Sequence, residues 1–211
     1  YADVVLGFDS LYDYLKGHPF FGAIAGRVAN RIPDGRFSID GTSYQLGANA
    51  DSNNHLHGGF RGFDKYIWDS ETFEYGDTLG LRLRRISPDG EEGYPGALDT
   101  TITYTLSADN VLGFELTAVA DKPTIVNIVQ PSYFKLAGHN SGDVTGQELS
   151  IAADKVTPTD ERLCPTGDLM DVAGTSFDLR TSTRLGAAFE KTEGVFDINY
   201  ILNQKSSGMN P

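Results

Sequence analysis

Residues 97–120 read ALDTTITYTLSADNVLGFELTAVA, and this stretch decides the fold class. In its first half, large apolar residues such as Leu98 and Ile102 alternate with polar ones. A period of two residues is typical of a strand that buries one face. Asp109 and Asn110 then favour a tight turn before a second apolar run. The stretch therefore predicts two antiparallel strands joined as a hairpin.

Outward from this hairpin, other segments show similar patterns. Residues 36–46 read RFSIDGTSYQL, in which Asp40-Gly41 supplies the positive φ that a two-residue hairpin turn needs. Residues 80–87, GLRLRRIS, alternate apolar with basic side chains, as a half-buried strand does. Further strands are predicted at 122–129, 148–153 and 196–202.

Evidence for helices is thin. Residues 9–17, DSLYDYLKG, have Asp9 as a candidate N-cap and Gly17 as a stop, and they allow barely two turns. The chain shows no internal repeat, no low-complexity stretch and no linker. The prediction is an all-β, mostly antiparallel sandwich or partial barrel, with a single domain over residues 1–211.

Composition narrows the classes of ligand. The 211 residues include 17 basic and 29 acidic side chains, which give a formal net charge of −12 and a pI near 4.6. Such a surface repels phosphate backbones and anionic membranes, while a neutral sugar is unaffected. No apolar run reaches the roughly 18 residues of a membrane helix, so membrane insertion is not expected. We therefore predict that nucleic acid is not a partner.

The single cysteine and the first residue give little information about function. Cys164 is the only cysteine, which excludes an internal disulfide and a cysteine-based zinc site, and a buried, inert thiol is expected. The chain begins at Tyr1 rather than Met, so the start is interpreted as processed, trimmed or incomplete.

Two segments carry candidate polar ligands for a sugar. In FGAIAGRVANRIPDGRF (21–37), small residues precede Asn30 and Arg31, which offer several hydrogen-bond donors in fixed geometry. The alternative is that both side chains only face solvent on the protein surface. In GVFDINYIL (194–202), Asp197 lies within an apolar run, where a carboxylate has to be paired, hydrated or bound to a ligand.

Histidines form a third candidate. In NNHLHGGFRGFDK (53–65), His55 and His57 are two residues apart, so on a strand they would share a face. No third ligand is evident, and a metal site is therefore not expected. The alternatives are an imidazole at a strand end, with paired glycines that let a ligand approach, and a structural histidine.

The loop DGEEGYPGALD (89–99) holds adjacent Glu91 and Glu92. Neighbours in sequence seldom face the same point, so we interpret them as solvated loop charges rather than as an acid pair.

Taken in order, these segments resemble the aldose 1-epimerase (galactose mutarotase) family. The motifs are GRVANRI, HLHGGFRGFDK, DGEEGYPG, VNIVQPSYFKLAG (126–138), TPTDERLCPTGD (157–168) and FDINYIL, and they span essentially the whole chain. The resemblance implies an antiparallel β-supersandwich and interconversion of the α and β anomers of hexoses such as glucose and galactose, without a cofactor. It also implies a soluble, cytoplasmic protein.

The resemblance assigns roles to several residues. His57 is similar to a family histidine that hydrogen-bonds the sugar near its ring oxygen and takes part in catalysis. Asn30 and Arg31 resemble the pair that holds sugar hydroxyls, and Asp197 resembles an aspartate with the same task. A carboxylate base takes the proton of the anomeric hydroxyl, while an imidazolium acid protonates the ring oxygen.

The chain departs from the family pattern at Pro131. The family's general-acid histidine occupies this position, and a pyrrolidine ring cannot transfer a proton. Loss of a general acid should cost roughly 3–5 kcal/mol of transition-state stabilisation. We therefore expect impaired catalysis, with a non-catalytic carbohydrate-binding or structural subunit of a larger assembly as the alternative.

The ends of the chain raise a second departure. The family's catalytic glutamate lies beyond the FDINYIL-type motif, and the chain ends nine residues after Leu202. We expect strands of the family fold to be missing from this chain at both ends. Strand edges left exposed in this way have to be covered. We interpret the sequence as part of a longer chain, with a protein partner that covers the edges as the alternative.

Overall fold

A computed structural model describes residues 2–17, 19–48, 53–192 and 196–203. The chain forms two compact units. We call residues 23–130 the internal unit, and residues 1–22 together with 131–211 the terminal unit. That the whole chain is one domain stays a prediction.

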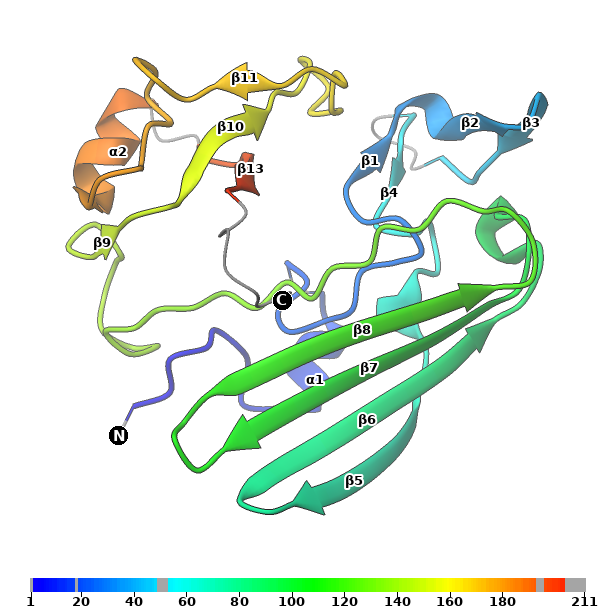
Figure 1. The fold of residues 1–211 in the computed structure, drawn as a ribbon, viewed down its shortest axis with the longest axis horizontal. Helices are drawn as coiled ribbons and strands as arrows, with labels where there is room; N and C mark the ends of the chain where they lie inside the picture. Colours follow the sequence, from blue (N-terminus) through cyan, green and yellow to red (C-terminus); the bar gives the residue numbers. More distant parts are fainter. Residues whose placement is uncertain (1, 18, 49–52, 193–195, 204–211) are drawn as a thin grey trace. The chain divides into compact units, whose positions relative to one another are not determined.

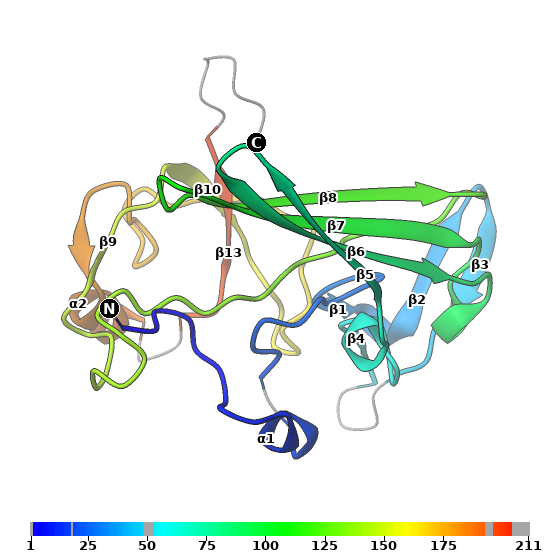
Figure 2. The same cartoon turned by 90° about the horizontal axis from the view of Figure 1, so that it is seen from below.

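The internal unit is built around one four-stranded antiparallel sheet (Figures 1 and 2). Its order is β5-β6-β7-β8, so each strand pairs with its neighbour in sequence. The strands are β5 (Asp69–Tyr75), β6 (Thr78–Ser87), β7 (Leu98–Ser107) and β8 (Leu112–Ala120). The predicted hairpin is confirmed, since β7 and β8 pair in antiparallel register from Leu98↔Ala120 to Leu106↔Leu112.

Two smaller strand pairs complete the internal unit. They are β1 (Arg31–Ile32) with β4 (His55–Leu56), and β2 (Arg36–Ile39) with β3 (Thr42–Gln45). The second pair confirms the predicted hairpin, because Asp40 and Gly41 take φ values of 49° and 79°. Short 3₁₀ turns lie at η1 (Pro33–Gly35), η2 (Phe63–Lys65) and η3 (Glu91–Gly93).

One end of the sheet carries the main core of the internal unit. On β7 the alternating residues Leu98, Thr100 and Ile102 are buried, as the period of two predicts. Leu98 and Ile102 pack with Ile24 and Phe63. A second cluster holds Ile32, Leu46 and Tyr94, and through Ile32 and Tyr94 it joins β1 to the loop after η3.

The terminal unit contains short strands and two helices. They are α1 (Leu11–Leu15), β9 (Glu148–Leu149), β10 (Ala153–Thr157), β11 (Met170–Asp171), β12 (Thr183–Arg184), α2 (Leu185–Lys191) and β13 (Asn199–Leu202). One sheet has the order β11-β10-β13, and β12 pairs with β9. All of these pairings are antiparallel. Among the described residues, no helix combines the length and apolar composition of a membrane-spanning segment.

Several local predictions need correction. The helix near the start is α1, and its N-cap is Ser10 rather than Asp9, because the Ser10 hydroxyl accepts the Asp13 N–H at 3.3 Å. Residues 122–129 form no continuous strand. They make isolated bridges, antiparallel at Val129 with Ala25 and parallel at Asn127 with Val28. A segment that meets its neighbour in two directions cannot extend a regular ladder.

Two further differences concern the strands. Within residues 148–153, only Glu148–Leu149 (β9) and Ala153, the first residue of β10, are in strands. Within 196–202 the strand β13 begins only at Asn199. The strand β5 was not predicted, because its sequence DSETFEY is polar and exposed on both faces apart from Phe73. An edge strand of this composition lacks the alternation on which sequence prediction relies.

Candidate functional site

Asn30, Arg31 and His57 come together in the internal unit, although 27 positions separate Asn30 from His57. Strand β1 begins at Arg31 and pairs with β4, so Asn30 lies opposite His57 just beyond the ladder. Their backbones continue the pairing, because His57 N–H donates to the Asn30 carbonyl at 3.0 Å. Backbone pairing therefore brings together three of the four predicted sugar-binding residues.

The imidazole of His57 has a defined hydrogen-bond role on one side. The backbone N–H of Asn30 donates to His57 Nδ1 at 3.1 Å. A backbone N–H can only donate, so Nδ1 is the acceptor and the neutral ring carries its proton on Nε2. Arg31 Nη1 donates to the side-chain oxygen Oδ1 of Asn30 at 3.3 Å, so the guanidinium of Arg31 is linked to the same residue that binds His57. The three side chains together present both donors and acceptors.

His55 does not share a face with His57. It is buried with 0% exposure, and both ring nitrogens have protein partners. Nδ1–H donates to the Gly47 carbonyl at 2.7 Å, and Nε2 accepts the Tyr94 hydroxyl at 2.6 Å. Burial lowers the pKa of His55 despite the Gly47 carbonyl and the charge of Glu92. His55 is thus a structural histidine in its neutral form.

The expectation of a shared face fails because β4 ends at Leu56. His57 opens a turn with φ 50°, and Gly58 and Gly59 follow with φ 93° and 101°. Positive φ in three successive residues turns the chain away from the strand. Gly58 is required here, since a Cβ at this position would lie 1.7 Å from the Gly26 carbonyl oxygen.

The two glutamates after β6 are not solvated loop charges. Glu91 is 11% exposed and forms an ion pair with Arg85, which is 8% exposed, with Arg85 Nη1 2.9 Å from Glu91 Oε2. Burial acts to raise the pKa of Glu91, but hydrogen bonds from Arg85 and Ser87 outweigh it and hold the pKa below its usual value. Glu92 points elsewhere, to the backbone N–H groups of Phe60 and Arg61.

Arg27 and Tyr94 form a buried cluster with Ser87, because Arg27 Nε donates to Ser87 Oγ at 2.9 Å and the Arg27 guanidinium lies 5.6 Å from the ring centroid of Tyr94. Arg27 is 1% exposed, and its guanidinium donates to the carbonyls of Ser87, Pro88 and Pro95. Burial lowers the pKa of Arg27 and raises that of Tyr94. The sequence did not predict this cluster, because its members come from three separate segments of the chain. The sequence signal for a buried carboxylate here was the pair Glu91 and Glu92, which lies between Gly90 and Gly93.

Asp197 and Pro131 lie in the terminal unit. Asp197 precedes β13 and is exposed. Pro131 is half-buried, and its carbonyl accepts the Gly22 N–H at 3.0 Å. Farther along this segment, the Tyr133 hydroxyl donates to the Pro19 carbonyl at 3.0 Å. Cys164 is buried and carries no disulfide, as expected.

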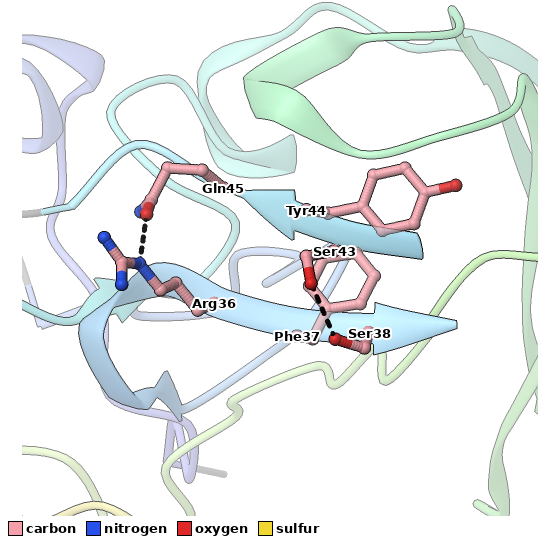
Figure 3. Close-up of a pocket in the computed structure, with 6 residues that line it drawn as sticks. All are labelled: Arg36, Phe37, Ser38, Ser43, Tyr44 and Gln45. Atoms are coloured by element: carbon pink, nitrogen blue, oxygen red, sulfur yellow. Dashed lines mark hydrogen bonds between the residues drawn. The ribbon is translucent and has the colours of Figure 1, made fainter. Parts of the chain in front are cut away.

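Two surface pockets are lined by other residues. One, of about 520 Å³, is lined by the β2–β3 hairpin, where Arg36 Nε donates to Gln45 Oε1 at 2.6 Å (Figure 3). The other, of about 250 Å³, lies in the terminal unit and includes Phe8, Phe21 and His139. Neither is lined by Asn30, Arg31 or His57. Within the described ranges, no three His, Cys, Asp or Glu side chains are grouped as metal ligands.

Comparison with known proteins gives consistent results. The family model for aldose 1-epimerase matches residues 1–210. The chain is 47% identical to galactose mutarotase of Rattus norvegicus over 204 residues, which cover 96% of this chain and 58% of that protein. It is 37% identical to aldose 1-epimerase of Escherichia coli over 212 residues, which cover 98% of this chain and 60% of the relative. The chain thus spans less than two thirds of these relatives.

Solved structures agree with the sequence relatives. Galactose 1-epimerase from Lactobacillus acidophilus matches with a TM-score of 0.87 and 33% identity, over 98% of this chain and 62% of that chain. An aldose epimerase homologue from C. elegans matches with a TM-score of 0.85 and 29% identity, over 97% and 62%. The all-β, antiparallel fold class is therefore confirmed as galactose mutarotase-like. Because the family model and the sequence relatives match nearly the whole of this chain, and because the fold agrees, the chain belongs to the aldose 1-epimerase family.

Proposed function

We propose that this chain supplies a hexose-binding site in which Asn30, Arg31 and His57 hold the sugar, and that its anomer interconversion is impaired. The observation that carries the proposal is the hydrogen bond from Asn30 N–H to His57 Nδ1. It assigns the donor hydrogen of the neutral ring to Nε2. A neutral N–H donor suits a sugar's ring oxygen or hydroxyl, neither of which carries charge.

The polar groups around His57 suit the same class of ligand. Sugar hydroxyls both donate and accept, so they are recognised by mixed sets of groups such as an amide and a guanidinium. Asn30 Oδ1 and Arg31 Nη1 are 3.3 Å apart, which keeps both groups on one side of the β1–β4 pair. Relatives are named galactose mutarotase and aldose 1-epimerase, which supports galactose or glucose as the hexose.

Impaired catalysis is proposed because of Pro131. Ring opening needs a proton on the endocyclic oxygen, and a positioned acid contributes about 10²–10⁴-fold. Proline offers no such proton. His57 is a poor substitute, because an imidazolium would place its Nδ1–H against the Asn30 N–H. The arrangement thus opposes the charged form that a general acid requires.

The test combines polarimetry with a binding measurement. Freshly dissolved α-D-galactose and α-D-glucose are followed by optical rotation with the wild type and with Pro131→His, while calorimetry measures hexose binding. We expect binding by the wild type with mutarotation close to the spontaneous rate. His57→Gln should weaken binding. Rapid mutarotation by the wild type would refute the impairment, and a lack of hexose binding would refute the binding proposal.

A non-catalytic carbohydrate-binding or structural role is the second candidate, and Pro131 is the observation that favours it. In the carbohydrate-binding role, hexose binding persists and Pro131→His leaves mutarotation at the spontaneous rate. In the structural role, neither hexose binding nor accelerated mutarotation is measured. Cytoplasmic location and a protein partner that covers strand edges are further proposals, which rest on the family resemblance and on the sequence alone. The net charge of −12 supports a neutral ligand over a nucleic acid.

A further inference from the structure

The turn that carries His57 is held from outside by a carboxylate. Residues 57–61 leave β4 with three successive positive φ values, so they make no regular ladder. Two successive N–H groups of this turn donate to Glu92. Phe60 N lies 3.1 Å from Oε2, and Arg61 N lies 2.9 Å from Oε1. Both oxygens of one carboxylate are therefore engaged by one short segment.

Glu92 is itself fixed by its surroundings. It takes φ 52° within η3, and its carbonyl accepts the Gly47 N–H at 3.4 Å. The preceding residue, Glu91, is tied to Arg85 on β6. The turn of residues 90–93 is thus attached to the sheet on one side and to the end of β3 on the other, and it aims the Glu92 side chain.

The carboxylate packs closely against the turn. A Cβ added at Gly59 would lie 2.2 Å from Glu92 Oε2 and 2.9 Å from His55 Cε1. His55 is held in turn by the Gly47 carbonyl and the Tyr94 hydroxyl. The backbone two residues after His57 therefore has little room to move.

We propose that Glu92 is a positioning residue for His57. By accepting two N–H groups of the turn, it keeps His57 Nδ1 facing the Asn30 N–H, which holds the ring proton on Nε2. The effect on sugar binding rests on the proposed function, whereas the effect on the ring does not. Glutamine cannot replace the carboxylate, because its NH₂ group would face one of the two backbone donors.

The experiment compares Glu92→Gln with Glu115→Gln. Glu115 is exposed on β8, so its substitution removes the same charge at a distance from the turn. Nitrogen NMR of the ring reports the tautomer of His57 without sugar, and calorimetry reports galactose affinity. In Glu92→Gln we expect the single Nε2–H tautomer to become a mixture and affinity to fall about tenfold, as the loss of hydrogen bonds to a charged group implies. Glu115→Gln should match the wild type in both.

The two measurements separate the two proposals. If the wild type binds no galactose, the proposed function fails, and the ring nitrogens still decide the role of Glu92. If Glu92→Gln does not fold, Glu92→Asp is measured instead, because it keeps the charge and withdraws the oxygens by one methylene. A His57 ring spectrum that is unchanged in the folded variant would overturn the positioning role.

Discussion

Replacing Glu91 by glutamine removes the negative charge from a buried ion pair while keeping the size of the side chain. Arg85 and Glu91 are 8% and 11% exposed, and the Arg85 guanidinium lies 3.6 Å from the ring centroid of Tyr66. Without the carboxylate, a buried cation loses its counter-charge, a change that typically costs about 3–5 kcal/mol. We therefore expect the free energy of unfolding to fall by about that amount.

The matched control is Glu71→Gln in the same sheet. Glu71 also pairs with an arginine, Arg82, at 2.9 Å, but the two side chains are 66% and 45% exposed. An exposed pair contributes about 0–1 kcal/mol, so this variant should unfold almost as the wild type does. Urea unfolding measures both, and the single variant Arg85→Met with the double variant Arg85→Met/Glu91→Gln completes a double-mutant cycle around the buried pair. A coupling energy of at least about 2 kcal/mol is expected between the buried partners.

The pH dependence follows from the same pair. The pKa of Glu91 in the folded chain is lowered from 4.5, so its stabilisation is complete above the unfolded value. It is lost as the pH falls through the lower, folded pKa. Wild-type stability should therefore decrease more steeply below about pH 4.5 than that of Glu91→Gln. A loss of less than 1 kcal/mol in Glu91→Gln at neutral pH would refute the reasoning.

The remaining predictions concern residues that pack around the candidate site, with one glycine elsewhere as a control. Tyr94→Phe leaves His55 Nε2 without its donor in a buried setting and should cost about 1–3 kcal/mol, measured by urea unfolding. Gly58→Ala places a Cβ 1.7 Å from the Gly26 carbonyl oxygen, so the turn has to move and a loss above about 3 kcal/mol is expected by thermal unfolding. Gly76→Ala, which has positive φ but open space, should cost only about 1–2 kcal/mol, and equal losses at the two glycines would contradict this.

Local sequence patterns predicted the elements whose signals lie within a few residues. Asp40-Gly41 indicated the β2–β3 turn, and the alternation after Ala97 indicated β7, because both depend on backbone conformation and on one buried face. The polar edge strand β5 and the short helix α2 carry no such pattern and were missed. Residues 122–129 are apolar enough for a strand, but their partners decide whether a ladder forms.

The amino-acid sequence by itself indicated the family, the antiparallel fold class, four candidate sugar-binding residues (Asn30, Arg31, His57 and Asp197) and the absence of an imidazole at position 131. The fold class follows from local periodicity, whereas the family, the site residues and the meaning of Pro131 follow from the resemblance of the motifs to a known family. A chain carries both kinds of signal in any conformation. Only the tertiary structure separated His55 from His57 and gave Glu91 and Glu92 their different partners. Hydrogen bonds and ion pairs join atoms that are close in space, and folding alone decides which distant residues become neighbours.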